Sequence, residues 1–425
     1  MSSEFNKGIS VTEDNQSTSS TEFDLVVLGA TGFTGRQAAK WISEWAVSQR
    51  PELRWAVAGR NSDKLAKVAA SLGVGPAPDV IQVDTSDKAG CAALAQRCAV
   101  LLTTVGPYAR YGEHVIAGCA QAGTDYVDIT GETPWVRQMI DKYDEVAQST
   151  GAKIIPLCGF DSIPSDVGAY LICRALQAAQ SQPTDVRALF SLKGGLNGGT
   201  LASALNMMEL KQGRNLYHPH LLTPSDGREH LASKQPRDLQ KPRFDEQLNS
   251  WITPFMMAPI NTRVVRRTAA QLGIQGQGYG PEFRYSEAMR ARSKWSAWQV
   301  ASMLGVINGL GRSSVGRTML KSFGPKPGQG PSAATMDGGF FRAKFWARGD
   351  DGQIARGQVS SSGDPGNRVT VNLLCTCATL LLTHRQELSE RVGFLTPVSA
   401  FGDHLIDAMR ALGMTVEASI DQGAG

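Results

Sequence analysis

The stretch DLVVLGATGFTGRQAAKWI, residues 24–42, decides the fold. An apolar run ends at Gly29, further glycines follow at Gly32 and Gly35, and a helix-favouring segment continues from there. Gly29 allows a tight turn, Gly32 lets a pyrophosphate approach the backbone, and Gly35 lets the helix pack on the sheet with its amides facing the anion. A turn without a ligand is the alternative, but the strand–turn–helix setting favours a dinucleotide-binding loop. The residues expected to contact the cofactor here are Gly29, Thr31, Gly32, Phe33, Thr34 and Gly35.

Two kinds of pattern divide the chain. Between residues 23 and 157, near-continuous apolar runs alternate with helical patterns, which is typical of a doubly wound parallel sheet with both faces buried. After Pro164, alternating strands appear, including a hairpin that turns at GDDGQ (349–353), and they indicate an antiparallel sheet. The sequence therefore predicts an α/β protein with a Rossmann-type domain and a second α+β domain. The expected units are a flexible tail (1–22), the dinucleotide-binding Rossmann domain (23–165), the α+β substrate or oligomerisation domain (166–364) and a helical segment packing back on the first domain (365–425).

The second predicted strand determines which dinucleotide we expect. It ends in Arg60, followed by Asn61 and Lys64, where an NAD enzyme would carry Asp or Glu to bind the ribose 2′-hydroxyl. A guanidinium can bind a 2′-phosphate bidentately, whereas a carboxylate would repel it. Solvated cations at a helix start are the less favoured alternative, because the helix dipole opposes them. NADP(H) is the predicted cofactor.

Two further strand ends belong to the same predicted site, because ligands of doubly wound sheets lie at the carboxyl ends of the strands. Asp84 follows the third strand and would lie near the adenine, with a helix N-cap as an equal alternative. The fourth strand ends in Thr104, Val105 and Gly106, which we expect near the nicotinamide ribose.

Composition and charge exclude several classes of function. The formal net charge is +4 in 425 residues, which is too small to predict nucleic-acid binding. Seven cysteines without CxxC spacing and six scattered histidines predict neither a disulfide framework nor a metal site. The polar N-terminal stretch lacks the features of a signal peptide, and no apolar run reaches the roughly 18–20 residues that cross a bilayer. We expect a cytoplasmic protein, either free or peripheral at a membrane.

Three motifs carry a family resemblance: TVGPYARYG at 104–112, GFDSIPSD at 159–166 and NTRVVRRT at 261–268. With them the chain resembles saccharopine dehydrogenase-like oxidoreductases, in particular the branch called trans-acting enoyl reductases. The resemblance runs from about residue 23 to 416 and implies a second domain placed over the cofactor. It also implies reduction of a carbon–carbon double bond in lipids made on polyketide assembly lines, whereas the family's true saccharopine enzymes make or cleave a C–N bond of an amino acid. One departure is Asn367, where the family pattern leads us to expect an aromatic residue.

The candidate catalytic residues are Tyr108, after the fourth predicted strand, and Asp161, after the sixth. Reduction of an enoyl thioester needs a hydride at the β-carbon, a proton at the α-carbon and support for the developing enolate. Either side chain could take part in the proton transfer, although Tyr108 could instead serve packing and Asp161 substrate binding. The Tyr-x-x-x-Lys pair of short-chain dehydrogenases is absent.

Three functions remain open, with an NADPH-dependent enoyl reductase acting on a small-molecule or carrier-bound acyl substrate as the leading one. The second is an amino-acid C–N oxidoreductase, although no cluster of arginines aimed at substrate carboxylates is evident in the second domain. The third is a non-catalytic NADP-binding scaffold at lipid surfaces.

A basic segment at 261–330 holds eleven Lys or Arg and two Glu, and within it residues 294–324 mix Trp, Met and Leu with flanking cations. Such a segment can lie on an anionic membrane or receive an acidic acyl carrier protein. A helical arm packed at a domain or homodimer interface is the alternative, and we favour it at this point.

Arg60→Ala tests the predicted cofactor. Loss of a charge-assisted bidentate contact with the 2′-phosphate is expected to reduce the preference for NADPH over NADH by about 10- to 100-fold. Binding of both nucleotides, measured by fluorescence titration, gives that ratio. A variant that keeps the wild-type preference would contradict this role for Arg60.

Overall fold

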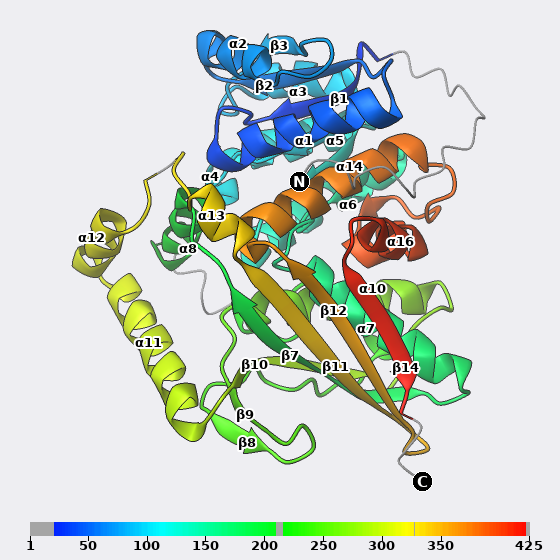
Figure 1. The fold of residues 1–425 in the computed structure, drawn as a ribbon. Coiled ribbons are helices and arrows are strands. Elements are labelled where there is room, and N and C mark those ends of the chain that lie inside the picture. The colour runs from blue at the N-terminus through cyan, green and yellow to red at the C-terminus, as the bar shows by residue number, and fades with distance from the viewer. Residues whose placement is uncertain (1–20, 210–215, 327, 422–425) are drawn as a thin grey trace.

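The computed structural model describes residues 21–209, 216–326 and 328–421. The predicted tail at 1–22 lies almost entirely outside these residues. Within them, two seven-stranded sheets form the framework (Figure 1). Helices that combine the length and hydropathy needed to span a bilayer are not found in this part of the chain.

The first sheet is entirely parallel and has the strand order β13–β6–β5–β4–β1–β2–β3. β1 lies between β4 and β2, so the strand order reverses beside β1 and the ligand-binding edge is at the carboxyl ends of β1 and β4. The predicted Rossmann-type sheet is therefore confirmed. Its strands are β1 (Phe23–Leu28), β2 (Trp55–Gly59), β3 (Asp79–Gln82), β4 (Cys98–Thr103), β5 (Asp125–Asp128), β6 (Lys153–Ile155) and β13 (Gly393–Phe394).

Both faces of this sheet are buried, as its apolar strands require. Alternate residues of β1 point to opposite faces, so Leu25 and Val27 join one hydrophobic core while Val26 and Leu28 join another. The first core is shared with α1 and with α14 (Thr370–Thr383), a helix of the C-terminal segment. The second core is shared with α3, α5 and α6. The helices of this region are α1 (Phe33–Gln49), α2 (Ser62–Ser71), α3 (Lys88–Gln96), α4 (Tyr108–Tyr111), α5 (Glu113–Ala122) and α6 (Thr133–Thr150).

The second sheet has the order β14–β12–β11–β7–β10–β9–β8 and is mixed. Its pairs are antiparallel, as predicted, except that β7 and β10 run parallel. Parallel pairing requires a long crossover connection. The chain between these two strands contains helices α8 (Gly198–Glu209) and α10 (Ala258–Ile274). The strands are β7 (Pro183–Lys193), β8 (Arg243–Asp245), β9 (Ser250–Thr253), β10 (Arg284–Ala291), β11 (Phe340–Gly349), β12 (Ile354–Ser362) and β14 (Thr415–Ile420).

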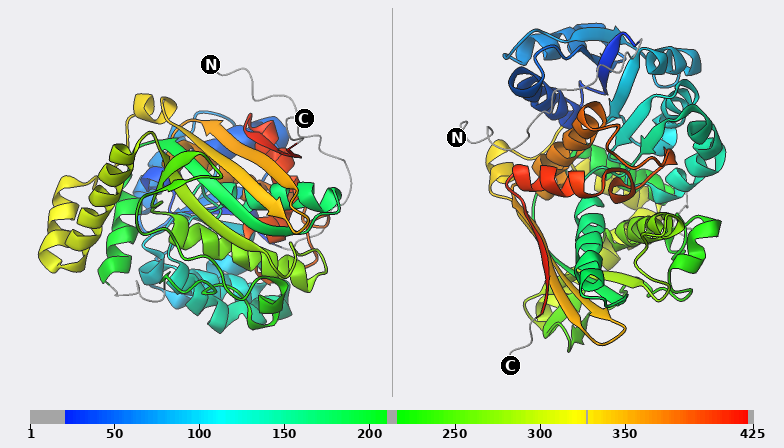
Figure 2. Two further views of the ribbon diagram at one scale, coloured as in Figure 1. Left: turned by 90° about the horizontal axis from the view of Figure 1, so that it is seen from below. Right: turned by 90° about the vertical axis from the view of Figure 1, so that its right-hand side faces the viewer.

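The C-terminal segment contributes to both sheets. β13 pairs with β6 of the first sheet, and β14 pairs with β12 of the second. Figure 2 shows α14 (orange) between the two sheets and β14 (red) along the second sheet's edge. The helices from α7 onward are α7 (Ile163–Ala178), α8 (Gly198–Glu209), η1 (Ser225–His230), α10 (Ala258–Ile274), α11 (Lys294–Arg312), α12 (Ser314–Phe323), α13 (Ala333–Asp337), η2 (Pro365–Val369), α14 (Thr370–Thr383), α15 (Pro397–Phe401) and α16 (Asp403–Ala411).

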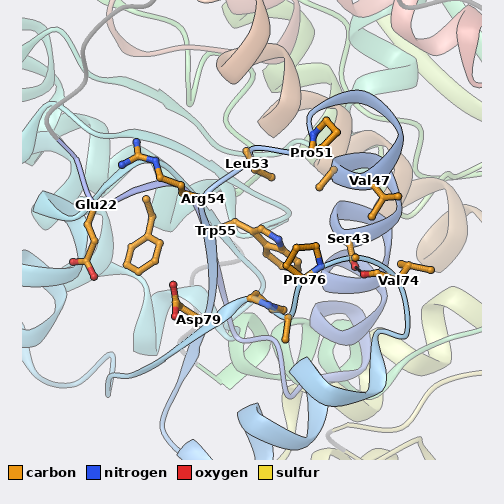
Figure 3. A pocket seen from close by; sticks show the side chains of 15 residues that line it. Glu22, Ser43, Val47, Pro51, Leu53, Arg54, Trp55, Val74, Pro76 and Asp79 are labelled. Atoms are coloured by element: carbon orange, nitrogen blue, oxygen red, sulfur yellow. Dashed lines mark hydrogen bonds between the residues drawn. The ribbon is translucent and has the colours of Figure 1, made fainter.

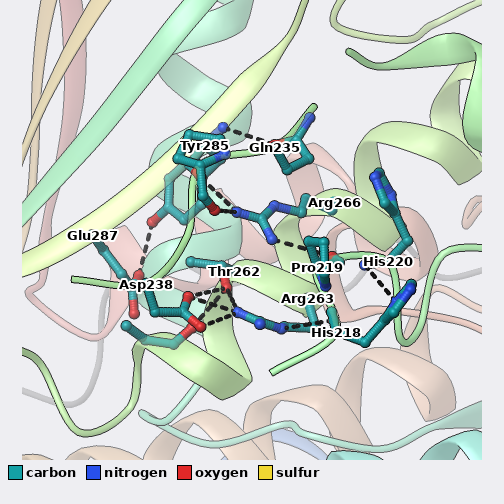
Figure 4. A network of polar contacts seen from close by, with 12 residues as sticks. His218, Pro219, His220, Gln235, Asp238, Thr262, Arg263, Arg266, Tyr285 and Glu287 are labelled. Carbon is teal, nitrogen blue, oxygen red and sulfur yellow. Dashed lines mark hydrogen bonds and ion pairs between the residues drawn. The ribbon is translucent and has the colours of Figure 1, made fainter. Parts of the chain in front are cut away.

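Helix α10 removes three of the eleven cations of 261–330 from the surface. Arg263, Arg266 and Arg267 are all buried, because α10 runs through the interior of the second domain. Arg263 pairs with the carboxylate of Asp238, at 2.6 Å (Figure 4). Burial lowers the pKa of Arg266 to about 9 and that of Arg267 to about 10. Their charges are met by main-chain carbonyls, those of Pro219, Pro236 and Tyr285 for Arg266 and those of Leu222 and Phe394 for Arg267.

Gly168 of α7 offers a test of how the second domain packs. A Cβ on this glycine would overlap the ring of Phe345 on β11, so Gly168→Ala is expected to destabilise the protein by about 1–3 kcal/mol. Gly305→Ala in α11 is the matched control, because a Cβ there meets nothing within 4 Å and alanine favours the helix by about 1 kcal/mol. Denaturant unfolding of both variants measures the difference. Equal stabilities would contradict the close contact between α7 and β11.

Candidate NADP site

The glycine loop between β1 and α1 leaves no room for side chains. Gly29 has φ +90°, and a Cβ on it would lie 2.8 Å from Cγ2 of Val105 and 2.9 Å from Oγ1 of Thr104. A Cβ on Gly35 would overlap the carbonyl oxygen of Gly29. Helix α1 begins after Gly32 without a side-chain cap, so its first amides are available to an anion. The loop therefore leaves backbone amides open to an anion, and its contact with the cofactor pyrophosphate stays a prediction.

A distant segment lies against this loop. Arg36, in the first turn of α1, donates through Nη1 to the Thr31 carbonyl at 2.7 Å and through Nη2 to the Gly328 carbonyl at 3.3 Å. A Cβ on Gly330 would overlap the ring of Phe33. The chain after α12 is thus placed over the predicted phosphate site. Sequence reasoning missed this contact because 292 positions separate Arg36 from Gly328.

The end of β2 presents two cations. Arg60 and Lys64 are exposed, and within the described residues neither side chain makes a hydrogen bond or an ion pair. The guanidinium of Arg60 is close enough to the Asp84 carboxylate to help lower the pKa of Asp84. Asn61 has a local role: its side chain accepts a hydrogen bond from the Lys64 amide at 2.8 Å and caps α2. Asp84 accepts hydrogen bonds from the amide and hydroxyl of Ser86, which lower the pKa of Asp84. The N-cap of α3 is Asp87. Arg60 and Lys64 are therefore the side chains still available for a 2′-phosphate.

The end of β4 joins the glycine loop. The Thr104 amide donates to the Leu28 carbonyl at 3.0 Å, which continues the β1–β4 ladder by one residue. The Val105 amide donates to Thr103 Oγ1 at 3.2 Å. A Cβ on Gly106 would lie 3.4 Å from the Ser203 hydroxyl, so α8 of the second domain lies beside the predicted nicotinamide end. Ser203 was not predicted, because nothing local in the sequence links it to Gly106.

Tyr108 is buried with its hydroxyl engaged by the main chain. The hydroxyl donates to the Thr103 carbonyl at 3.2 Å and accepts from the Ile129 amide at 3.4 Å. Burial raises the pKa of Tyr108 well above its usual value. The carboxylate of Glu132 accepts from the Tyr108 amide at 2.8 Å and so holds the start of α4. Glu132 follows β5, and the carboxyl-edge rule applied to that strand would have found it.

Asp161 lies in the loop between β6 and α7, between the two sheets. The neighbouring Phe160 packs its ring against Phe190 and Phe341 of the second sheet, with centroids 6.4 and 5.0 Å apart. Burial raises the pKa of the Asp161 carboxyl to about 6. In the part of the chain that the structure describes, this carboxyl has no hydrogen-bond or ion-pair partner. Its catalytic role stays a prediction, as does that of Tyr108.

Comparisons with known proteins identify the family. A model of the saccharopine dehydrogenase NADP-binding domain matches residues 25–155. A Mycobacterium tuberculosis relative is 37% identical over 420 residues, 94% of this chain and 98% of that protein. A Mycobacterium bovis relative named trans-acting enoyl reductase is 36% identical over 415 residues, 93% of this chain and 97% of that protein.

The chain belongs to the saccharopine dehydrogenase-like oxidoreductases, in the trans-acting enoyl reductase branch. Its first domain binds NADP(H), and the predicted cofactor is confirmed. Yeast saccharopine dehydrogenase (L-Glu forming) has the same fold, with a TM-score of 0.54 at 11% identity over 94% of this chain and 100% of that one.

Asn367, the departure from the family pattern, is a buried polar junction in this saccharopine dehydrogenase-like enzyme. Its Nδ2 donates to Asp364 Oδ1 at 2.8 Å and to the Gly195 carbonyl at 3.1 Å, and its Oδ1 accepts from Asn197 at 2.8 Å. The other Asp364 oxygen accepts from the Gly195 amide. An amide side chain is suited to this position because it donates and accepts at once. The junction fixes the chain just before α8.

The pocket in Figure 3 is not the NADP site. It has a volume of about 380 Å³ and is lined by the first residues of three strands, Phe23, Trp55 and Asp79. It therefore lies at the amino edge of the first sheet, opposite the edge where doubly wound folds bind their cofactors.

A group of possible metal ligands lies outside the NADP site. Side-chain ligand atoms of His384, Glu387 and His404 lie within 4.8 Å of one another. The sequence predicted no metal site, because these residues do not form a local metal-binding motif. Arg50, at the end of α1, donates to the Leu382 carbonyl, so the group is near the end of α1 that is remote from the glycine loop.

Glu287 offers a test of the buried network in Figure 4. Its Oε2 accepts from Ser165 and Tyr285, and burial raises its pKa to about 7. The folded state therefore prefers the protonated acid, so this stabilisation is complete below the ordinary pKa of 4.5 and is lost as the pH rises through 7. Glu287→Gln is expected to remove up to about 3 kcal/mol of that pH dependence. Unfolding from pH 4 to 8 measures it, with Glu52→Gln at an exposed position as the control.

Proposed function

We propose that the protein is an NADPH-dependent enoyl reductase that saturates a carbon–carbon double bond of a lipid or polyketide-type acyl substrate. The observation that carries the proposal is the similarity, over 93% of the chain, to proteins named trans-acting enoyl reductases. The loop and cation geometry at the carboxyl edge of the first sheet is consistent with it. NADPH, when bound, supplies the hydride.

The chain's own contribution is proton delivery by Asp161. Its carboxyl has no partner among the described side chains and a pKa of about 6, so about a tenth of it carries the proton at pH 7, far more than for an ordinary Asp. After the hydride reaches the β-carbon, Asp161 gives its proton to the α-carbon, becomes a carboxylate and regains a proton from solvent. Tyr108 and Glu132 shape the neighbouring loop after β4, because their contacts fix the first turn of α4.

The hydrogen bonds that the α10 arginines already make disfavour an amino-acid substrate. A C–N oxidoreductase of the saccharopine type needs cations for the substrate's carboxylates. Arg263, Arg266 and Arg267 are the densest group of arginines in the second domain, but their guanidinium groups already donate to Asp238 or to main-chain carbonyls. A substrate carboxylate would have to displace buried hydrogen bonds to reach them.

Asp161→Asn tests this function. Loss of the acid is expected to lower turnover of enoyl thioesters by about 10²- to 10⁴-fold while NADPH affinity stays unchanged. Wild-type turnover should fall as the pH rises above about 6, because the carboxyl loses its proton there. NADPH oxidation measured across pH with a panel of enoyl thioesters provides both results.

Two further measurements separate the alternatives. Tyr108→Phe should keep most of the activity, and the opposite pattern, loss in Tyr108→Phe but not in Asp161→Asn, would make Tyr108 the proton donor. NADPH oxidation with imine-forming amino acids but not with enoyl thioesters would establish the C–N reaction. NADPH binding without any turnover would favour the scaffold.

A further inference from the structure

Helices α11 and α12 form an arm that extends from the second domain, residues 294–323 (Figures 1 and 2). Of its 30 residues, only Ala297, Gly311 and Gly316 are buried. The arm is anchored at its start by β9, where the Thr253 hydroxyl donates to the Ala297 carbonyl at 2.9 Å. Farther along it rests on α8, because Gly311 contacts Met208 and the residue after α12, Gly324, lies against Leu201. Most of its surface therefore faces away from the protein.

The exposed surface of the arm is apolar. Phe323 is 84% exposed, Val315 79% and Trp295 76%, which are values far from those of a packed side chain. In α12 the exposed apolar residues recur every four positions and form a stripe. In α11 the exposed apolar residues lie 3, 8, 11 and 12 positions after Trp295. At 100° per residue, these positions all fall within one half of the helix circumference. The residues of these two stripes are Trp295, Trp298, Met303, Val306, Ile307, Val315, Met319 and Phe323.

The charges within the segment that contains the arm all have one sign. Residues 288–336 contain seven Lys or Arg and no Asp or Glu. Residues 295–311 of α11 contain no charged side chain, and Lys294 and Arg312 stand at its two ends.

Lys321 lies on α12. Ser313 is both the C-cap of α11 and the N-cap of α12, so the two helices follow each other directly. Lys321 lies six positions after Val315 and two before Phe323, so it is on the polar side of α12, opposite the apolar stripe. An apolar face with cations on the polar side and at the helix ends is the pattern of helices that lie in a bilayer interface.

We propose that the arm docks on the surface of an anionic lipid bilayer. Its tryptophans and Phe323 enter the interface between headgroups and acyl chains, and Lys294, Arg312 and Lys321 contact lipid phosphates. A second copy of the chain is disfavoured as the occupant, because two such arms would bring four cations each against one another without an anion on either arm. An acidic carrier protein matches the charge but not the uncharged apolar face of α11.

Docking in this way orients the enzyme. The α8 helix that holds the arm also carries Ser203 beside Gly106, at the predicted nicotinamide end of the NADP site. The membrane would therefore lie on the α8 side of the molecule, where an acyl chain could pass between bilayer and site. The docking itself does not depend on the proposed reaction, so vesicle binding and enoyl reduction can fail independently.

Co-sedimentation with vesicles tests the proposal on the full chain. The wild type is expected to bind vesicles that contain phosphatidylglycerol and to bind phosphatidylcholine vesicles much more weakly, with affinity that falls as salt rises. Trp295→Ser combined with Phe323→Ser should abolish most of this binding. Lys294→Glu combined with Lys321→Glu should weaken it by about 25-fold or more, since each cation contributes about fivefold.

Matched controls separate docking from loss of fold. Val80→Ser with Phe340→Ser removes exposed apolar groups outside the arm, and Lys67→Glu with Lys344→Glu reverses charges outside it. Both should bind vesicles like the wild type, and NADPH binding should be retained in all variants. The proposal is overturned if the wild type fails to bind anionic vesicles at low salt, or if the controls lose binding as much as the arm variants. It is equally overturned if the arm instead mediates a dimer or binds an acidic carrier protein without binding vesicles.

Discussion

The close contact of backbone with backbone at the glycine loop is the constraint on which the rest of the structure depends. The first turn of α1 lies so near the end of β1 that a Cβ on Gly35 would overlap the Gly29 carbonyl, and β4 closes on Gly29 from the other side. This contact fixes the direction in which α1 leaves the sheet and keeps its first amides open. The adjacent strand ends then contribute Arg60 and Lys64 to the same edge. A substitution at either glycine would shift the helix, the strand ends and the cofactor together.

The second domain is held over this edge by segments that are remote in sequence. Gly328–Pro331 lies against Phe33 and Arg36, Arg110 of α4 donates to Asn206 and Glu209 of α8, and Asn367 ties the chain before α8 to η2. The C-terminal segment adds a strand to each sheet. Helix α8 therefore has contacts with both domains and with the arm.

The local parts of this architecture could be predicted from sequence, and the parts made by long-range contact could not. The order of strand, glycine turn and helix, and the cations after β2, depend on neighbours within a few positions, so their pattern is visible in the chain. The parallel pairing of β7 with β10 and the contact of Arg36 with Gly328 join segments that are far apart in the sequence, so no local pattern predicts them. Arg263, Arg266 and Arg267 misled the prediction because composition records a charge but not the carbonyl that receives it.

In this protein, structural residues differ from candidate functional residues in whether their polar side chains already have hydrogen-bond partners, and residue type alone does not separate them. Tyr108 is the kind of residue that donates protons, yet its hydroxyl already donates its proton to one main-chain group and accepts a hydrogen bond from another. The α10 arginines are the kind that bind carboxylates, yet they are buried against carbonyls. Asp161 is half-buried, desolvation raises the pKa of its carboxyl to about 6, and it has no partner within the described chain. Burying an unpartnered carboxyl costs stability. Such a cost is expected to persist where the group acts on a ligand that binds beside it, which is why we propose Asp161, and not Tyr108, as the proton donor.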